Sequence, residues 1–456
     1  MAVLDYIINL GASVMLPIII FVFALVVRTK PSKAFRAALT VGIGFIAINL
    51  IIGLLSNSLG PATKEIIDRF GIELSVIDVG WPAASAISFG AAVGSLAIPI
   101  GIGVNVLMLL FGLTRTLDID LWNYWHIAFT GALVTIITGS FTLGVYTSVV
   151  HMIVLLVLAD LTAHHIEKYY GYKNISFPHG TSAPYYLIAL PFEKLFNAIP
   201  GVRNIKADPD AIQKRFGVFG EPSVLGLILG VIIGILAGFS LSEILQLGVK
   251  TAAVMYLLPR MVKILMEGLM PISEAAGKMI KKRFPGRDFN IGMDSAIAVG
   301  HPTVISSALI LIPITLLLAV ILPGNKVLPF ADLVGIPFII CMMVPVFRGN
   351  VFRTVVAGAI AIGGGLYIAS YIAPVFTKAA TNAGFQLPEG ATQISSLIDG
   401  IIPTTILFIW AGKLGYIGLT VLGLIFLAVG YWQKRKHQLA KNASEANPQA
   451  AEAAKE

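Results

Sequence analysis

Long apolar runs separated by short polar connections make up most of the chain. About 20 apolar residues in an α-helix cross the hydrocarbon core of a bilayer. By that measure the pattern predicts eleven membrane-spanning helices, at residues 6–27, 37–59, 91–112, 125–146, 147–163, 222–239, 241–265, 296–322, 328–346, 351–373 and 401–431. The runs lack the alternation of apolar and polar positions that is typical of outer-membrane barrel strands. The pattern therefore predicts an all-α polytopic membrane protein.

Two stretches depart from the regular pattern of apolar spans. The segment 126–163 must supply two spans from 38 residues, so we expect a break near Gly139–Ser140 or near Gly144. The polar segment 433–456 is rich in Ala and Glu beyond Asn442, where it lacks a long apolar face. We expect this tail to be disordered or a frayed helix.

Composition supports a membrane protein. Of the 456 residues, 57% are hydrophobic and 12% are charged, whereas a soluble domain carries about 25% charged residues. These values exclude a soluble protein and a disordered one. The single Cys excludes an intrachain disulfide and a cysteine-based metal cluster.

The net charge of +8 is better explained by membrane topology than by binding of nucleic acid. Lys and Arg collect on cytoplasmic loops, and they are frequent in 28–36, 278–289 and the start of the tail at 433–437. The C-terminus is therefore expected in the cytoplasm, and an odd number of spans places the N-terminus outside. The first run has its basic residues behind it, so we expect a first span rather than a cleavable signal peptide.

Short matches recur between the two halves of the chain. VGWP at 79–82 matches VGHP at 299–302, IPI at 98–100 matches IPI at 312–314, and the dipeptide Asp-Leu occurs at 120–121 and 332–333. The offsets are 220, 214 and 212 residues. The equivalent loops have opposite net charge, −2 for 61–78 and +3 for 278–298. We interpret the matches as an inverted duplication, typical of secondary transporters; chance similarity between apolar segments is the alternative.

This interpretation divides the chain into five parts: two repeats, the linker between them, a last span and a tail. The first repeat, 1–200, has five spans and a hairpin near 174–190. A cytoplasmic linker follows, and the second repeat has five spans and a hairpin near 388–400. The linker covers residues 201–217, the second repeat 218–400, the last span 401–432 and the tail 433–456.

Interrupted helices point to a binding site, because they free backbone groups to face a substrate. Pro82 and Pro302 each open an apolar span and push the preceding residue out of the helical region. The stretches 174–190 and 388–402 are Gly- and Pro-interrupted and polar, which suits re-entrant hairpins. A plain helix N-terminus in the first case, and an amphipathic surface loop in the second, are the competing interpretations.

Polar and aromatic side chains near these breaks and hairpins, or opening a span, are the candidate substrate contacts. For Asp78 and Asp294, capping of a helix N-terminus is the competing role, and for Glu221 it is interaction with a helix dipole. The full candidate set is Asp78, Trp81, Ser85, His179, Thr181, Ser182, Glu221, Asp294, His301 and Gln393.

Motifs for nucleotide binding, serine hydrolysis, zinc proteases and thiol redox chemistry are absent from the sequence. ATP-driven transport by this chain alone is therefore excluded, and we expect no catalytic residue, cofactor or metal site. A covalent phosphocarrier domain is also not expected, because the tail is short.

Several segments carry a family resemblance, among them IDVGWPAASAISFG, ISFPHGTSAPYYL, FNIGMDSAIAVGHPTV and FRGNVFR. Over residues 1–435 the chain resembles the membrane component (enzyme IIC) of the galactitol phosphotransferase system, a family related to the ascorbate permeases. The resemblance implies a permease that binds galactitol or a close hexitol and moves it inward. There enzyme IIB, charged through enzyme IIA from phosphoenolpyruvate, phosphorylates it.

The resemblance further implies a homodimer in the lipid of the inner membrane, with an elevator-type core that moves against a scaffold. The main alternative is an ion-coupled secondary transporter of a polyol or sugar acid, with Asp78, Asp294 and Glu221 as its only candidate coupling sites. A membrane-embedded enzyme or a structural membrane subunit is a third possibility. The spacing of residues does not choose among polyols.

Overall fold

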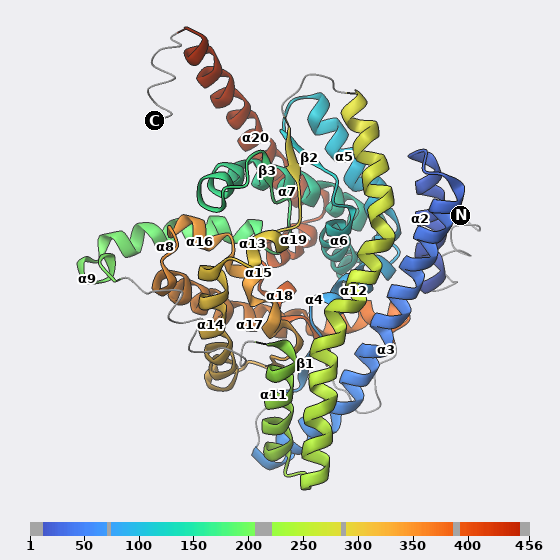
Figure 1. Ribbon diagram of the computed structural model, residues 1–456, viewed down its shortest axis with the longest axis vertical. Helices are drawn as coiled ribbons and strands as arrows, with labels where there is room; N and C mark the ends of the chain where they lie inside the picture. The colour runs from blue at the N-terminus through green and yellow to red at the C-terminus, as the bar shows by residue number, and fades with distance from the viewer. Residues whose placement is uncertain (1–11, 71–73, 206–220, 284–288, 386–392, 447–456) are drawn as a thin grey trace.

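The computed structural model describes residues 12–70, 74–205, 221–283, 289–385 and 393–446, and these are mostly helical (Figure 1). The predicted linker 201–217, the hairpin near 388–400 and the tail 433–456 lie partly outside the described residues. The helices are α2 (Ala12–Val26), α3 (Pro31–Phe70), α4 (Trp81–Gly90), α5 (Ala97–Leu110), α6 (Trp125–Thr138), α7 (Phe141–Tyr170), α8 (Ala183–Ala198), α9 (Pro200–Arg203), α11 (Pro222–Ala237), α12 (Leu241–Arg283), α13 (Ala296–Val299), α14 (Pro302–Ile321), α15 (Ile336–Ile340), α16 (Met343–Val346), α17 (Val351–Asn382), α18 (Leu397–Ile401), α19 (Pro403–Lys413) and α20 (Gly415–Ala446).

Six stretches within the described helices are long and apolar enough to cross a membrane. They lie in α3, α7, α12, α14, α17 and α20. Helix α4 and residues 94–110, which include α5, meet at a bend of 85°. If this bent pair is one span, it is the seventh membrane-spanning stretch. Large apolar side chains on these helices are exposed, such as Ile417 and Leu241. The chain is therefore a multi-pass membrane protein, as predicted, while the number eleven stays a prediction.

Several helix boundaries differ from the predicted ones. The break in 126–163 lies at Gly139, which has φ +70° and ends α6, and Ser140 caps α7 through its side chain. Left-handed backbone strongly favours glycine, and a Gly in this conformation is a common helix ending. Gly415, also with φ +70°, divides the predicted last span into α19 and α20.

Other differences concern helix length. The predicted span 328–346 is a series of short pieces, the 3₁₀-helix η4 (Ala331–Gly335), α15 and α16, with Pro337 and Pro345 among them. Helix α20 continues to Ala446, so it includes the first part of the predicted tail. Lys, Ala and Gln, which recur there, are all good helix formers.

In the described part of the chain, six strands of two or three residues form two parallel sheets, which the sequence did not predict. In the first sheet β1 (Val76–Asp78) lies between β5 (Val327–Leu328) and β6 (Gln393–Ser395). In the second, β4 (Asn290–Gly292) lies between β2 (Thr116–Asp118) and β3 (Ile175–Ser176). Each sheet thus places one strand from one half of the chain between two strands from the other half.

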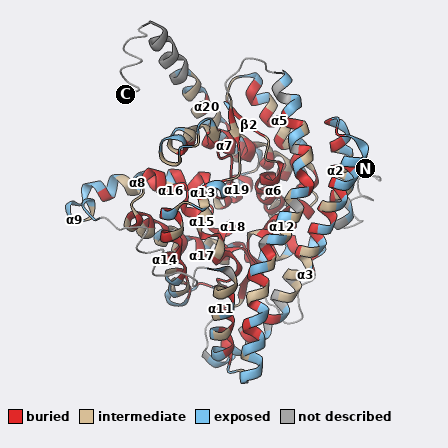
Figure 2. Cartoon of the chain, in the orientation of Figure 1, coloured by how far each residue is buried: buried red, intermediate tan, exposed pale blue. Residues whose placement is uncertain are grey.

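The long helices α3 and α12 pack along each other, and α11 packs on α12 (Figure 1). Glycines at every fourth position of α11 permit the second contact: a Cβ at Gly226 would lie 2.7 Å from the carbonyl oxygen of Thr251, and one at Gly230 would lie 2.8 Å from the Cα of Gly248. Small residues at this spacing let membrane helices approach closely. Buried residues concentrate instead in α6 and α16 (Figure 2).

Candidate functional site

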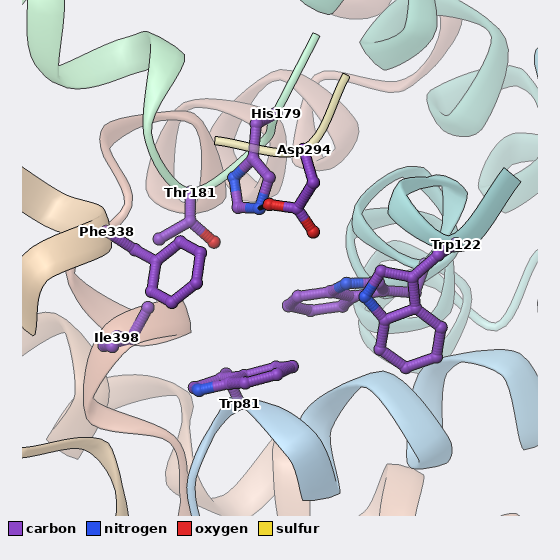
Figure 3. A pocket seen from close by; sticks show the side chains of 8 residues that line it. Trp81, Trp122, His179, Thr181, Asp294, Phe338 and Ile398 are labelled. Carbon is purple, nitrogen blue, oxygen red and sulfur yellow. Dashed lines mark ion pairs between the residues drawn. The ribbon is translucent and has the colours of Figure 1, made fainter. Parts of the chain in front are cut away.

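A pocket lies where both sheets end, surrounded by residues from distant parts of the chain (Figure 3). Its free space is about 20 Å³, room for about one water molecule. The lining residues are Trp81, Trp122, Trp125, His179, Thr181, Asp294, Phe338 and Ile398. Most are apolar or aromatic, with a few polar groups among them, which is the usual composition of a small-molecule site.

The sheets position these residues. Trp81 follows β1, His179 follows β3 and Asp294 follows β4, each by two or three residues. Trp122, in the 3₁₀-helix η2 (Leu121–Tyr124), follows β2, and Ile398 follows β6 at similar distances along the chain. Because the strands within each sheet are parallel, their carboxyl ends lie at one edge. The pocket therefore lies at the carboxyl ends of five short strands.

His179 and Asp294 form the polar centre of the pocket (Figure 3). The Nε2 atom of His179 lies 3.4 Å from Oδ1 of Asp294, and that oxygen also accepts the backbone N–H of Ala296 at 2.8 Å. Both residues lie in connections outside the membrane-spanning helices. Burial raises the pKa of Asp294 to about 6 and lowers the pKa of His179 to about 3. At neutral pH the pair is therefore a carboxylate beside a neutral imidazole.

Thr181 is oriented by His126 on α6. The Nε2 atom of His126 lies 2.9 Å from the Thr181 hydroxyl oxygen, and its Nδ1 lies 2.8 Å from the carbonyl oxygen of Asn123. A Cβ at Gly180 would lie 2.4 Å from the His126 ring, so only glycine permits this approach. The sequence analysis did not single out His126, because no helix break flanks it.

Aromatic rings form the rest of the wall. The ring of Phe338 stacks on His179 with centroids 5.6 Å apart, and Trp81 lies 6.0 Å from Phe338. Trp122 faces them across the pocket in Figure 3, and Trp125 also lines the pocket. Trp122 and Trp125 were not among the predicted site residues. The sequence did contain one indication of them, because they come shortly after two aspartates in the stretch 118–120.

Four predicted site residues line this pocket, namely Trp81, His179, Thr181 and Asp294. Ser182 lies directly behind it: its backbone N–H donates to Nδ1 of His179 at 3.3 Å, and its hydroxyl lies 2.7 Å from that of Ser295. The structure therefore brings together candidates from three separate segments of the sequence.

The other five candidates do not line the pocket. Ser85 donates to the carbonyl oxygen of Pro82 within α4. His301 caps α14 and packs on the rings of Tyr169 and Tyr170. The remaining three are Asp78, discussed next, Gln393 in strand β6 and the exposed Glu221 before α11.

Asp78 and Asp332 hold the backbone around the pocket. The carboxylate of Asp78 accepts four backbone N–H groups from 80, 330, 332 and 397. Asp332 accepts the N–H of Trp81 at 2.6 Å and that of Ile398 at 2.9 Å. The buried carboxylate of Asp332 thus holds two pocket residues, Trp81 from the first half of the chain and Ile398 from the second.

A second, larger cavity of about 330 Å³ is almost wholly apolar. It lies between α7, α8, α19 and α20, and Thr404 is its single polar side chain. It lacks the polar groups that a hydrophilic solute requires. The polar pocket is therefore the candidate functional site.

Fold and site together define a multi-pass membrane protein with a small pocket lined by aromatic and polar side chains. The family model for the PTS system sugar-specific permease component matches residues 6–390. The chain belongs to this family and is a permease subunit of a phosphotransferase system.

Two relatives from Escherichia coli K12 extend the comparison over nearly the whole chain. The galactitol-specific EIIC component of the PTS system is 43% identical over 426 residues, covering 93% of this chain and 94% of that protein. A putative permease IIC component is 40% identical over 437 residues, covering 95% of this chain and 99% of that protein.

Proposed function

We propose that this chain binds galactitol, or a close hexitol, and carries it inward for phosphorylation by enzyme IIB, itself charged by enzyme IIA. The observation that carries the proposal is the pocket itself, in which Asp294 and Thr181 face aromatic rings. A polyol offers hydroxyl groups to the polar side and C–H faces to the rings. The name of the relative that is 43% identical supports galactitol within this class.

We assign the substrate contacts to Trp81, His179, Thr181 and Asp294, with Ser182 behind them. The free space of about 20 Å³ is far smaller than a hexitol. The substrate therefore enters when the segments around the pocket separate, and the present geometry is a closed arrangement. His301, Asp78, Ser85, Glu221 and Gln393 would act through the backbone or in another conformation.

Phosphorylation would then trap the substrate. A phosphate group adds nearly two negative charges at neutral pH. Ionised Asp294 repels such a group, and the apolar walls offer it no counter-charge. Binding is thus compatible with the neutral polyol and unfavourable for its phosphate ester, which favours release to the cytoplasm.

The arrangement of the sheets supports an inverted duplication. Central strands β1 and β4 begin at residues 76 and 290, which is the offset of 214 residues found for the IPI match. The bend of 85° between α4 and α5 supports a re-entrant segment. We extend the proposal to eleven spans, an outside N-terminus, a cytoplasmic C-terminus and residence in the inner membrane.

The packed helices α3, α11 and α12 suit a scaffold, and the helices around the pocket suit a moving core. We propose that the core moves elevator-like against this scaffold and that two copies form a dimer. Cross-linking of cysteines placed on α3 and α4, in a variant without Cys341, would test the movement. A rate unaffected by the cross-link would contradict it.

The deciding experiment for the function is uptake of radiolabelled galactitol by cells that express this chain with or without the IIA and IIB subunits. Phosphorylated product that requires both subunits and phosphoenolpyruvate is the expected result. Unphosphorylated galactitol that accumulates without them, and is lost on addition of an uncoupler, would indicate an ion-coupled transporter instead.

A further inference from the structure

The protonation of His126 can be worked out from its neighbours. Its Nδ1 atom lies 2.8 Å from the carbonyl oxygen of Asn123, which can only accept, so Nδ1 carries a hydrogen. The backbone N–H of Thr181 points at Nε2 at 3.2 Å. An N–H cannot donate to a protonated nitrogen, so Nε2 is bare and the ring is neutral.

This assignment determines what the Thr181 hydroxyl can do. Its oxygen lies 2.9 Å from Nε2 of His126, so the hydroxyl donates its single hydrogen to that nitrogen. The oxygen then offers only lone pairs to the pocket. A fixed tautomer on α6 thereby converts a hydroxyl that could act in either sense into an acceptor.

The same reasoning applies to His179. The backbone N–H of Ser182 donates to its Nδ1 at 3.3 Å, so the hydrogen of the neutral ring is on Nε2. Nε2 faces Oδ1 of Asp294 at 3.4 Å. The single N–H of the imidazole therefore lies on the side of Asp294.

Asp294 completes the polar wall. One oxygen accepts from Ala296 and faces His179, while the second points into the pocket in Figure 3. An ionised carboxylate has no hydrogen to donate. The N–H donors among the lining side chains, apart from His179, are the indoles of Trp81, Trp122 and Trp125 in the aromatic wall.

We propose that the polar wall formed by Thr181 and Asp294 is acceptor-only and selects ligands that donate hydrogen bonds from two hydroxyl groups. The inference rests on the proposed function and deepens it. The wall admits neutral polyols and rejects sugar acids and phosphate esters, whose oxygens there would meet lone pairs with no hydrogen between them.

Deoxy and deoxyfluoro analogues of galactitol test the direction of these hydrogen bonds. Fluorine resembles a hydroxyl in size and can accept weakly, but it cannot donate. At the positions that face Thr181 and Asp294, we expect the fluoro and deoxy analogues to bind equally poorly, about tenfold or more below galactitol. Affinity of the purified protein would be measured by displacement of radiolabelled galactitol.

The outcomes separate the two claims. A fluoro analogue within about twofold of galactitol at every carbon would overturn the acceptor-only wall while leaving galactitol as the substrate. No binding of galactitol itself would overturn the proposed function instead. Either result is obtained on the unmodified protein, so it does not depend on the folding of a variant.

Asp294→Asn supplies an independent test, because the amide adds a donor to the wall. D-galactonate has the same carbon chain with a carboxylate at one end. We expect the unmodified protein to bind it at least about 100-fold more weakly than galactitol, and the variant to reduce that ratio about tenfold. An unchanged ratio in a variant that still binds galactitol would contradict the proposal. Asp68→Asn, the same chemical change at an exposed position on α3, is the matched control.

Discussion

Replacement of Asp78 by asparagine would disrupt the junction at which its carboxylate binds four backbone N–H groups from the segments around the pocket. Oδ1 of Asp78 accepts the N–H groups of Gly80 at 3.2 Å and Leu397 at 3.0 Å. Oδ2 accepts those of Phe330 and Asp332, both at 2.9 Å. Asparagine keeps one acceptor oxygen, and its NH₂ group would face two N–H donors with no acceptor between them.

The magnitude follows from these contacts. A hydrogen bond to a charged group contributes about 1.5–3 kcal/mol. Two of the four are lost, so the variant should lose about 3–6 kcal/mol of unfolding free energy. Since native proteins are stable by only about 5–15 kcal/mol, this loss is large. Trp81 and Ile398 lie beside the junction, so galactitol binding should fall as well.

The assay is unfolding of the purified protein in mild detergent by titration with a denaturing detergent, followed by tryptophan fluorescence. Asp68→Asn is the matched control, because it makes the same chemical change at an exposed position on α3. Unfolding of Asp78→Asn within about 1 kcal/mol of the control would refute the reasoning, since even one lost bond of this type exceeds that value.

Three further changes have definite expected results. Gly230→Ala should destabilise the contact between α11 and α12 by about 1–3 kcal/mol through overpacking. Gly364→Ala is the control, because a Cβ there meets nothing within 4 Å and should cost nothing. Detergent unfolding of the two variants measures the difference. Galactitol affinity should fall below pH 6, because burial raises the pKa of Asp294 to about 6 and protonation replaces an acceptor by a donor; a binding curve at pH 5–8 that is flat would contradict this. Glu193→Gln should cost about 3–5 kcal/mol by leaving the buried guanidinium of Arg353 without the counter-charge that lies at 2.7 Å. The double variant with Arg353→Met should recover part of that loss in the same titration.

The membrane class and part of the site were predictable from local sequence. Hydropathy is a property of each segment by itself, so the spans of α7, α14 and α17 were visible as apolar runs. The hairpin motif FPHGTS contained His179 and Thr181, and Asp294 stood out beside a break. These residues carry their signal in their immediate neighbours.

The rest of the site had no such signal. Phe338 and Ile398 lie in ordinary apolar stretches, and nothing in their neighbours distinguishes them from lipid-facing positions. Asp78 was a reasonable candidate for a substrate contact by its position, but its oxygens are occupied by backbone N–H groups from residues more than 250 positions away. A candidate carboxylate cannot be distinguished from a structural one until its partners are known.

The sequence by itself determined the multi-pass class, the breaks at Pro82, Gly139 and Pro302, and the polar residues next to them. The tertiary structure decided how those breaks meet. Strands of two or three residues are stable only when paired, and the partners of β1 and β4 lie in the opposite half of the chain. Their pairing brings Trp81, His179 and Asp294 to one pocket, because only contacts between segments distant in sequence can set that geometry.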